Sequence, residues 1–240
     1  MDKNMTAVIT GGGSGIGEAA SKILLDNDYS VISIGMHTPD WSHKKFQAIK
    51  HDLLDISKTQ RLAKDISKHH NVTHLIHNAG MILPHVLEEM SVDDLTILTN
   101  LHAGAAVILT QEFVSGMKEN QFGRIIFNSS RASLGLETRS AYSYSKAGII
   151  GMARTWALEF ASHGITVNSL APGPILTDNF WDLIDKDSPE QEAAASKIPV
   201  GRLGKPEDVA RAIKFFADPE NSFITGQTLY VCGGLSIASG

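Results

Sequence analysis

The stretch from Ala141 to Gly148 places a tyrosine and a lysine four residues apart at the start of a strongly helical segment. Side chains at i and i+4 share a helix face, so Tyr142 and Lys146 are expected side by side, whereas Tyr144 has Gly148 at its own i+4 position. A tyrosine has an ordinary pKa of about 10, and an ammonium about 4 Å away at an effective dielectric of about 20 is worth about 4 kcal/mol, on the order of three pKa units before desolvation opposes it. The pair is expected to bring the pKa of Tyr142 to about 7 and to serve general acid–base chemistry.

A glycine-rich turn lies directly after the first expected strand and opens the first expected helix. It reads TGGGSGIG from Thr10 to Gly17. Glycine permits a tight turn, lets the backbone approach a pyrophosphate and brings helix close to strand, while the helix N-terminus offers N–H groups and the positive end of its dipole. The turn does not end in Gly-Lys-Ser/Thr, which argues against a nucleoside-triphosphate loop. We therefore expect a dinucleotide cofactor, NAD or NADP, held by Gly11, Gly13, Ser14, Gly15, Ile16 and Gly17.

The end of the second expected strand, about 20 residues beyond the loop, is where an acidic residue holds the ribose hydroxyls of NAD. Here the strand is followed by Met36 and His37, which are expected beside the ribose, and no carboxylate occurs before Asp40. A cation at this point would favour the additional phosphate of NADP. Protonated His37, Lys44 or Lys45 could reach that phosphate, although a solvated surface role fits each of them equally well. The preference between NAD and NADP is left open.

Short β-rich apolar runs alternate with longer segments of helical spacing, which is typical of repeated βαβ units and a parallel sheet covered on both faces. The expected strands are 7–10, 30–34, 47–50, 74–77, 123–129, 166–169 and 228–231. The expected helices lie near 15–27, 58–70, 91–119, 141–163 and 206–217. The pattern predicts an α/β fold, a doubly wound parallel sheet in one domain over residues 1–240, without internal repeats or linkers. In such a fold ligands bind outside the carboxyl ends of the strands.

Residues 174–200 depart from the alternation of strands and helices. They contain several aspartates and a helix-favouring run from Gln191 to Ala195, which predicts one or two short helices inserted after a strand. Because of its place in the sheet, the insertion is expected to be a substrate lid, and the alternative is a surface excursion. The loops predict a moderately apolar substrate pocket formed by Met81, Leu83, His85, Leu134, Leu136, Phe180 and Trp181.

The composition favours a small molecule as the partner. Lys and Arg number 21 against 26 Asp and Glu, a net charge of -5 without long runs of like charge, so we expect neither nucleic acid nor an anionic membrane to bind. We see no signal peptide and no apolar stretch approaching about 18 residues, and therefore expect a soluble, cytoplasmic protein. Cys232, the single cysteine, is expected to be a packing residue. The ten histidines include no His-Glu-x-x-His, so no metal site is expected.

Several motifs occur in one order along nearly the whole chain, from about Thr6 to Ser236. They are TGGGSGIG, HDLLD with Asp52, Asn78-Ala79-Gly80, TNLHAG with Asn100, a serine pair after IIFN, YSYSK, Pro172-Gly173 with Thr177, and GQTLYVCGG. In combination they resemble the short-chain dehydrogenase/reductase family, of the 3-oxoacyl-acyl-carrier-protein reductase or alcohol dehydrogenase type. The resemblance implies a three-layer α/β/α Rossmann fold and hydride transfer between NAD(P)(H) and the carbonyl or secondary alcohol of a small organic substrate.

The resemblance also implies catalytic roles. Tyr142 would exchange a proton with the substrate oxygen, and Lys146 would lower the pKa of Tyr142 and hold the nicotinamide ribose. Asn100 matches the asparagine that kinks a helix and holds a water in the proton relay to Lys146. A serine should bind the same substrate oxygen. Counting from the preceding strand favours Ser130, whereas counting back from Tyr142 gives Ser129.

Other matched positions are implied to hold the cofactor. Asp52 and Leu53 would meet the adenine, and Asn78, Ala79 and Gly80 would line the cofactor cleft. The nicotinamide end would meet Pro172, Gly173, Ile175 and Thr177.

The chain also departs from the family pattern. His77 stands where the family often has asparagine and Cys232 where it often has aspartate, and neither is a catalytic position. Only 17 residue steps separate Gly35 from Asp52, so the usual helix between the second and third strands is expected to be largely lost. This segment normally shapes the adenine-ribose pocket, which is a further reason why the cofactor preference stays open.

Three functions are weighed. The leading hypothesis is an active alcohol dehydrogenase or ketone reductase. A second keeps the fold but uses transient oxidation for epimerisation or dehydration, and a third is a non-catalytic nucleotide-sensing protein, which the presence of Tyr142 and Lys146 disfavours. The family usually forms tetramers or dimers through the helices near 91–119 and 141–163. Apolar residues on those helices would serve such an interface, or core packing equally well: Phe113, Met117, Met152, Trp156 and Phe160.

Overall fold

The computed structural model of the chain describes residues 5–177, 180, 185–186 and 188–238. The strands within these residues are β1 (Thr6–Thr10), β2 (Ser30–Gly35), β3 (Phe46–Lys50), β4 (His74–His77), β5 (Gly123–Asn128), β6 (Ile165–Pro172) and β7 (Thr228–Val231). The α-helices are α1 (Gly15–Leu25), α2 (Ile56–His69), α3 (Val92–Thr99), α4 (Ala105–Glu119), α5 (Ser140–Phe160), α7 (Pro189–Ser196) and α8 (Pro206–Ala217). Shorter turns are the π-helical η1 (Asn100–Gly104) and the 3-10 turns η2 (Arg131–Leu134) and η3 (Ala161–His163). Every strand expected from the sequence is present.

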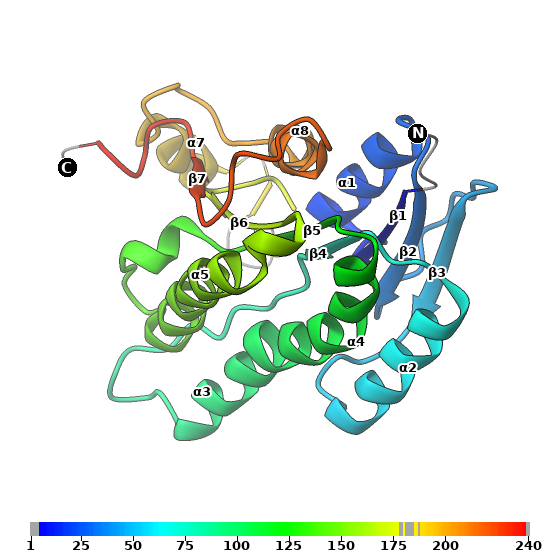
Figure 1. Cartoon of the computed structure of the whole chain (residues 1–240). Helices are drawn as coiled ribbons and strands as arrows, with labels where there is room; N and C mark the ends of the chain where they lie inside the picture. The colour runs from blue at the N-terminus through cyan, green and yellow to red at the C-terminus, as the bar shows by residue number, and fades with distance from the viewer. Residues whose placement is uncertain (1–4, 178–179, 181–184, 187, 239–240) are drawn as a thin grey trace.

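The seven strands form one parallel sheet in the order β3-β2-β1-β4-β5-β6-β7. The order reverses between β1 and β4, which is the switch point where open α/β sheets bind ligands at the carboxyl ends of their strands. From β1 the chain proceeds through β2 to β3 at one edge of the sheet, then crosses back to β4 and proceeds through β5 and β6 to β7 at the other edge (Figure 1). The doubly wound α/β fold expected from the sequence is therefore confirmed.

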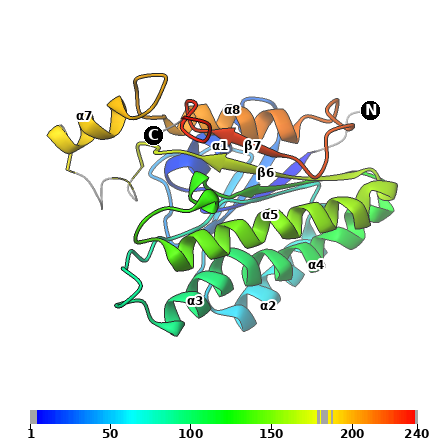
Figure 2. The ribbon, with the colours of Figure 1, turned by 90° about the vertical axis from the view of Figure 1, so that its left-hand side faces the viewer.

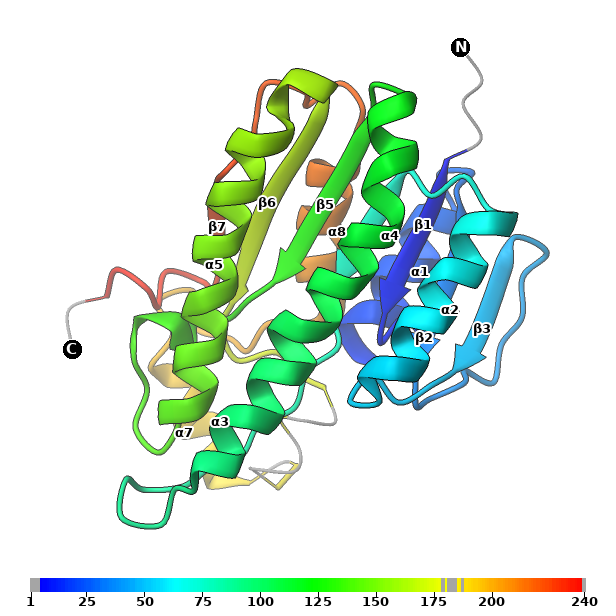
Figure 3. The ribbon, with the colours of Figure 1, turned by 60° about the horizontal axis from the view of Figure 1, so that its bottom comes forward.

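Alternate residues of the central strands face two separate apolar cores. On one face Val8 and Leu75 pack with α2, α4 and α5, and on the other Ile9 and Ile76 pack with α1 and α8. Figure 2 shows the sheet between these two helical layers, and Figure 3 shows α2, α4 and α5 across one face. Full burial of an aliphatic side chain of this size contributes about 1.5–3 kcal/mol. The two cores fix the strand register, because a shift of one residue would exchange the faces.

The helix expected over 91–119 is present as one helical run that contains a π-helical turn. It divides into α3 and α4 at the π-helical turn η1, where the N–H of Ala105 donates to the carbonyl of Asn100, five residues earlier. Such a bond accommodates one extra residue in the helical turn, and π-helical turns are frequent at functional sites. The extent of the predicted helix is thus confirmed, and Asn100, the residue implied to kink it, begins the π-helical turn.

The continuous helical run Val92–Glu119 is long and apolar enough to cross a membrane by length and composition, because an 18-residue window of it has a mean hydropathy of 1.2. The expectation that no such stretch exists is therefore wrong. However, Leu109, Phe113 and Met117 are almost fully buried against the sheet. The run is a core helix of this fold, and for Phe113 and Met117 core packing accounts for the apolar side chain.

The connection between β2 and β3 contains no helix in residues 36–45, as expected from its length. Trp41 holds this connection against α1, since its Nε1 donates to Oε1 of Glu18 at 2.9 Å. The Trp41 ring also packs on Phe46, the first residue of β3, at 4.4 Å between ring centroids. The shortened crossover is thereby fixed beside the glycine loop at the start of α1.

The insertion after β6 contains α7, which confirms that a short helix forms there. Ser188 caps it, because the Ser188 hydroxyl oxygen accepts from the N–H of Gln191 at 3.3 Å. Trp181, which the sequence places in the substrate pocket, lies outside the described residues. The role of the insertion as a substrate lid stays a prediction.

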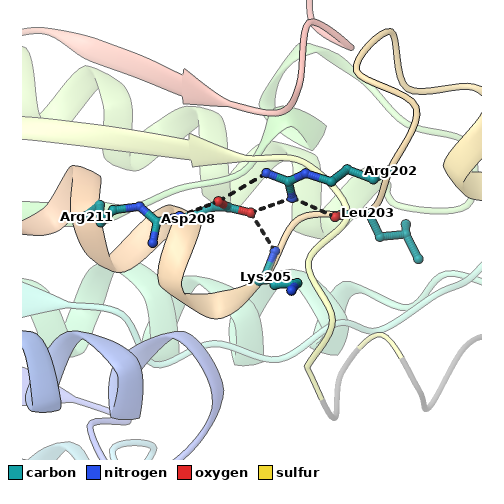
Figure 4. Close-up of polar contacts among 5 residues, drawn as sticks. All are labelled: Arg202, Leu203, Lys205, Asp208 and Arg211. Atoms are coloured by element: carbon teal, nitrogen blue, oxygen red, sulfur yellow. Dashed lines mark hydrogen bonds and ion pairs between the residues drawn. The ribbon is translucent and has the colours of Figure 1, made fainter.

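Helix α8 begins at a carboxylate that closes its first turn. Oδ2 of Asp208 accepts from the main-chain N–H of Lys205 at 2.9 Å and from Arg202 at 2.7 Å, and Oδ1 accepts from Arg211 at 2.6 Å (Figure 4). These hydrogen bonds, first that of Arg202, lower the pKa of Asp208 to about 2. Because α8 packs against α1, the contacts of Asp208 support the helix that begins at the glycine loop.

Candidate active site

The loop between β1 and α1 is so tight that two of its positions have no room for a Cβ, and a third has a backbone conformation that favours glycine. A Cβ on Gly17 would lie 2.0 Å from the carbonyl oxygen of Gly11, and a Cβ on Gly13 would lie 2.4 Å from the carbonyl oxygen of His37. Gly15 has a φ of +50°, in the left-handed region that glycine adopts without strain. Ser14 caps α1 in an extended conformation and Ile16 lies in its first turn, so the N-terminus of α1 opens at the loop. This cradle fits the pyrophosphate of a dinucleotide.

The Asn78-Ala79-Gly80 segment is tied to the glycine loop through Thr10. The main-chain N–H groups of Asn78 and Ala79 both donate to Oγ1 of Thr10 at 2.9 Å. The Asn78 amide donates to the carbonyl of Thr10 at 3.1 Å, and its Oδ1 accepts from Asn128 at 2.8 Å. The carboxyl ends of β1, β4 and β5 are thereby joined into one edge of the site.

His77, the departure from the family pattern in β4, has a structural role in this network. Its Nδ1 lies 3.2 Å from Oγ1 of Thr10 and its Nε2 lies 3.2 Å from the carbonyl of Leu101. Burial, followed by the nearby charge of Lys146, lowers the pKa of His77 to about 3. His77 is therefore neutral and bridges β1 to η1.

Ser130, and not Ser129, lies beside Tyr142. Ser130 shares a side-chain hydrogen bond with Tyr142, and its oxygen also accepts from the N–H of Ala132 at 3.1 Å as the cap of η2. The buried hydroxyl of Ser129 instead donates to the main-chain carbonyl of Lys146 at 2.7 Å. Of the two serines left open by counting, only Ser130 offers its hydroxyl to the tyrosine.

Lys146 is almost fully buried in α5, four residues after Tyr142. Its Nζ donates to the carbonyl of Asn128, the last residue of β5, at 2.9 Å and lies 5.6 Å from the centroid of the Tyr142 ring. Burial lowers the pKa of Lys146 to about 7. The shared helix face expected from the i, i+4 spacing therefore holds, but the lysine is fixed by a strand carbonyl.

Burial raises the pKa of Tyr142 above its ordinary value of 10.0, while the hydrogen bond of Ser130 and the charge of Arg139 act in the opposite direction and are smaller. The expectation that Lys146 brings this pKa to about 7 is therefore wrong for the protein without a cofactor. Two physical reasons account for the difference. The buried phenolate would lose its hydration, and the pKa of Lys146 is itself about 7, so this lysine is only partly charged at neutral pH.

Asn100 is the first residue of η1. Its carbonyl accepts from the N–H of Ala105, and its side-chain Oδ1 lies 3.7 Å from where a Cβ on Gly104 would be. Among the described residues no contact between Asn100 and Lys146 is resolved. The water-holding role implied for Asn100 thus remains a prediction.

The residues after β6 close over the glycine loop. A Cβ on Gly15 would lie 3.2 Å from the methyl group of Thr177, so Thr177 lies directly above the loop. Ile175 is buried and bridges to Gly204. Pro172 ends β6, and the next residue, Gly173, admits no Cβ without approaching Cα and Cβ of Cys232 at 3.0 Å. Cys232 is accordingly a packing residue.

The adenine end of the expected cofactor site lies after β2 and β3. Leu53 is buried in the core, while Asp52 is exposed and accepts from the N–H of Leu54 at 2.9 Å. Met36 is 55% exposed, and His37 lies against the loop through its carbonyl at Gly13. These residues surround one end of the loop without presenting a carboxylate at the end of β2.

Lys44 and Lys45 directly precede β3 and therefore lie at the amino edge of the sheet, away from the loop. Nζ of Lys45 pairs with Oδ1 of Asp28 at 2.7 Å and with the Asp28 carbonyl at 3.0 Å. The hypothesis that either lysine reaches a cofactor phosphate is therefore wrong, because a parallel strand separates them from the site.

The sequence analysis did not single out His102, which the structure places in the same cluster. His102 lies in η1, is fully buried, and packs edge-on against the Tyr142 ring at 5.7 Å between ring centroids. Its position two residues after Asn100 was the only signal that could have found it.

The cradle of the loop, the switch point beside it and the helix face shared by Tyr142 and Lys146 together define an NAD(P)-binding Rossmann-fold oxidoreductase. A family model described as enoyl-(acyl carrier protein) reductase matches residues 11–236. With this match, the chain belongs to the short-chain dehydrogenase/reductase family and is an NAD(P)-dependent dehydrogenase or reductase.

Named relatives cover almost the whole chain. The subunit BbsD of (2S)-[(R)-hydroxy(phenyl)methyl]succinyl-CoA dehydrogenase from Thauera aromatica is 35% identical over 249 residues, 99% of each chain. The 3-oxoacyl-[acyl-carrier-protein] reductase FabG of Rickettsia bellii is 36% identical over 240 residues, 96% of each chain. Among solved structures, ElxO with NADP bound has a TM-score of 0.89 at 28% identity, covering 97% of this chain and 99% of that one.

Proposed function

We propose that this protein transfers a hydride between NAD(P)(H) and the carbonyl or secondary alcohol carbon of a small organic substrate. The proposal rests on the side chains that surround Tyr142. Its phenol shares a hydrogen bond with Ser130, and Lys146 follows on the same helix face. Two neighbouring hydroxyl groups can both reach one substrate oxygen, which is what protonation of a carbonyl during reduction requires.

In the direction of reduction, the proposed steps use a neutral tyrosine. Ser130 donates a hydrogen bond to the carbonyl oxygen, and Tyr142 transfers its phenolic proton to that oxygen. The raised pKa of Tyr142 keeps its phenol protonated at neutral pH, and it suits this donor role. When bound, the nicotinamide supplies or accepts the hydride at C4. In the direction of oxidation, Tyr142 must instead begin as a phenolate.

Lys146 and Asn100 serve the proton path in this proposal. Lys146, held by the Asn128 carbonyl, would bind the nicotinamide ribose and stabilise the Tyr142 phenolate as a cation. Asn100 would hold a water between Lys146 and solvent at the η1 turn. The remaining parts of the cofactor would be held by the glycine loop, Asn78-Ala79-Gly80, and the residues after β2, β3 and β6.

The substrate class is proposed from the relatives. Both named curated relatives act, by their names, on thioester-linked acyl groups that carry a hydroxyl or keto group. Next to Ser130, the turn η2 leads into Leu134 and Leu136, which are 57% and 46% exposed and would pack against an acyl chain. We therefore place 3-oxoacyl or 3-hydroxyacyl thioesters first among candidate substrates.

Three other functions are kept as outcomes of the test. The description of the matching family model names an enoyl reductase, which reduces a carbon–carbon double bond. Epimerisation or dehydration through transient oxidation would use the same side chains without net change in the cofactor. A nucleotide-sensing protein would bind NAD(P)(H) without turnover.

The deciding experiment offers acetoacetyl-CoA, crotonyl-CoA and butanone to the purified protein with NADH and NADPH in parallel, and follows the absorbance of the reduced nicotinamide. We expect its oxidation with acetoacetyl-CoA and none with crotonyl-CoA. Turnover of crotonyl-CoA alone would establish enoyl reduction. Loss of substrate without net cofactor change would favour epimerisation or dehydration, and cofactor binding with no turnover of any thioester, ketone or alcohol would support a sensor.

We also propose that the protein is cytoplasmic and assembles as a homotetramer or homodimer. Leu158 on α5 and Val92 on α3 are 84% and 76% exposed, and burial of such side chains between copies would be favourable. Size-exclusion chromatography with light scattering tests the proposed assembly, and a monomer at micromolar concentration would contradict it.

A further inference from the structure

His102 is held in a defined orientation between two residues of α5. Its Nδ1 lies 2.8 Å from Oγ of Ser145, and its ring meets the Tyr142 ring edge-on. The side chain is fully buried in η1. The orientation therefore aims the other ring nitrogen, Nε2, away from Ser145 and into the site.

The hydrogen bonds of Ser145 decide the tautomer of His102. The Ser145 hydroxyl donates to the main-chain carbonyl of Tyr142 at 2.9 Å, and a carbonyl can only accept. Since the hydroxyl has a single hydrogen, it can make both this bond and the 2.8 Å contact with His102 only when Nδ1 is the donor, and we adopt this tautomer. Burial, and then the charges of Lys146 and His77, lower the pKa of His102 well below its ordinary value, so the ring is neutral. Nε2 is thus an unprotonated acceptor.

Nε2 of His102 is buried and has no hydrogen-bond partner among the described residues. A Cβ built on Gly80 would lie 2.9 Å from this Nε2 and 3.3 Å from Nζ of Lys146. One point is therefore close to both nitrogens, a separation that a single bridging water can span. An unmade hydrogen bond at a buried acceptor is costly, and the Lys146 ammonium has N–H groups beyond the one directed at Asn128.

We propose that one water bridges the Lys146 ammonium and Nε2 of His102, accepting from the ammonium and donating to Nε2, and that His102 is thereby a positioning residue that keeps this lysine charged beside Tyr142. The inference rests on the proposed function for its catalytic meaning, but not for the contact itself. A hydrogen bond to the ammonium favours the protonated form of Lys146 and opposes the effect of burial. It therefore widens the pH range over which Lys146 is a cation.

The other groups that face Lys146 do not duplicate this contact. From β5 the Asn128 carbonyl accepts one hydrogen bond, and from α5 the Tyr142 phenol is kept neutral by burial. From β4 His77 faces the same lysine, but both of its ring nitrogens already lie within 3.2 Å of other partners. Within the described part of the chain, Nε2 of His102 and Oδ1 of Asn128 are buried acceptors without a hydrogen-bond partner in this region, and Nε2 of His102 is the one that lies close to a common point with Nζ of Lys146.

Two substitutions of His102 test the roles of its two ring nitrogens one at a time. His102→Asn places an amide nitrogen near the position of Nδ1, so it keeps the donor to Ser145 and removes the acceptor at Nε2. His102→Gln reaches the position of Nε2 with a polar atom and gives up the contact with Ser145. If the proposal holds, H102N lowers kcat for reduction by about tenfold, and H102Q retains more activity than H102N. If His102 only supports Ser145, the order of the two variants is reversed.

The pH profile gives a readout that packing would not move. Reduction requires protonated Lys146, so its rate falls as the pH rises through the pKa of this lysine. Loss of the Nε2 acceptor lowers that pKa, and the fall begins at lower pH in H102N than in the wild type. An unchanged profile in H102N would overturn the proposal.

A measurement on the cofactor-free protein separates the contact from the proposed function. Nitrogen-15 NMR of the imidazole groups should show His102 with its proton on Nδ1 and an Nε2 resonance that moves in Lys146→Met. This result would support the contact even if no substrate were turned over. A proton on Nε2, or an Nε2 resonance that is the same in K146M, would overturn it.

Discussion

Tyr142 and Lys146 are both taken out of water by α5, and each is disfavoured in its charged form by the same burial. The pKa of the phenol rises and that of the ammonium falls to about 7, so at neutral pH the uncharged tyrosine predominates. A neutral phenol is ready to donate a proton, whereas oxidation needs the phenolate. Oxidation is therefore expected to accelerate as the pH rises, and reduction to slow at alkaline pH.

Arg139 provides a test of this electrostatic account at the scale of one residue. Its charge lowers the pKa of Tyr142, in opposition to burial. In Arg139→Gln this pKa rises further, because the phenolate loses a nearby positive charge. The rate of oxidation should then fall several-fold at neutral pH, with its rise displaced to higher pH.

The control is Arg131→Gln, which removes a guanidinium from η2, directly after Ser130. If both variants displace the pH profile of oxidation equally, net charge and not proximity of Arg139 to Tyr142 would be responsible. Profiles measured at two salt concentrations add a check, since added salt screens the effect of a partly exposed arginine.

At the scale of elements, the site depends on where β5 ends and α5 begins. Asn128, the last residue of β5, accepts a hydrogen bond from Lys146 and donates one to Asn78. Of the next two residues, Ser129 directs its hydroxyl to the main chain of α5 and Ser130 directs its hydroxyl to Tyr142. On the opposite layer, α8 packs on α1 and so supports the helix that receives the dinucleotide. The cap of α8 is therefore an element-scale determinant of stability.

Asp208→Asn tests that cap. The folded-state pKa of Asp208, about 2, lies below its ordinary 3.8, so its stabilising contribution is fully present above about pH 4 and is lost as the pH falls toward 2. Asn keeps an acceptor for the Lys205 N–H but loses the charge facing Arg202 and Arg211. We expect the free energy of unfolding to fall by about 1 kcal/mol at neutral pH, and the difference to shrink as the pH falls toward 2.

Chemical denaturation at several pH values measures this difference. Asp93→Asn, in the first turn of α3, is the matched control because Asp93 has no ion pair among the described residues. A loss in D93N equal to that in D208N would assign the effect to a generic charge at a helix N-terminus.

The strands, the glycine loop and the lost helix between β2 and β3 could be predicted because each depends on local pattern and on length. The π-helical turn at Asn100 could not be located by periodicity, since the apolar pattern runs through it without a break. The choice between Ser129 and Ser130 depended on which hydroxyl faces α5, a property of packing that counting residues leaves undetermined.

At the scale of the whole molecule, two apolar cores cover the faces of the sheet, and the candidate site lies at the carboxyl ends of its strands. Burial is the largest cause of the pKa shifts of Tyr142, Lys146 and His102. The loss of hydration at each group depends on many residues that are distant in the sequence. This is why the i, i+4 spacing of Tyr142 and Lys146 predicted their shared face but gave the wrong direction for the tyrosine pKa. His102 could not be predicted from the sequence for the same reason, because its role depends on contacts with Gly80 and Ser145, which are distant in the sequence.

The central claim, that Tyr142 transfers the proton, is tested most directly by comparing Tyr142→Phe with Tyr144→Phe. Tyr144 lies two residues away on the same helix but is 59% exposed. With the best substrate of the panel, Y142F should lose at least about a hundredfold in kcat while still binding NAD(P)H, and Y144F should behave as the wild type. Undiminished turnover by Y142F would contradict the account.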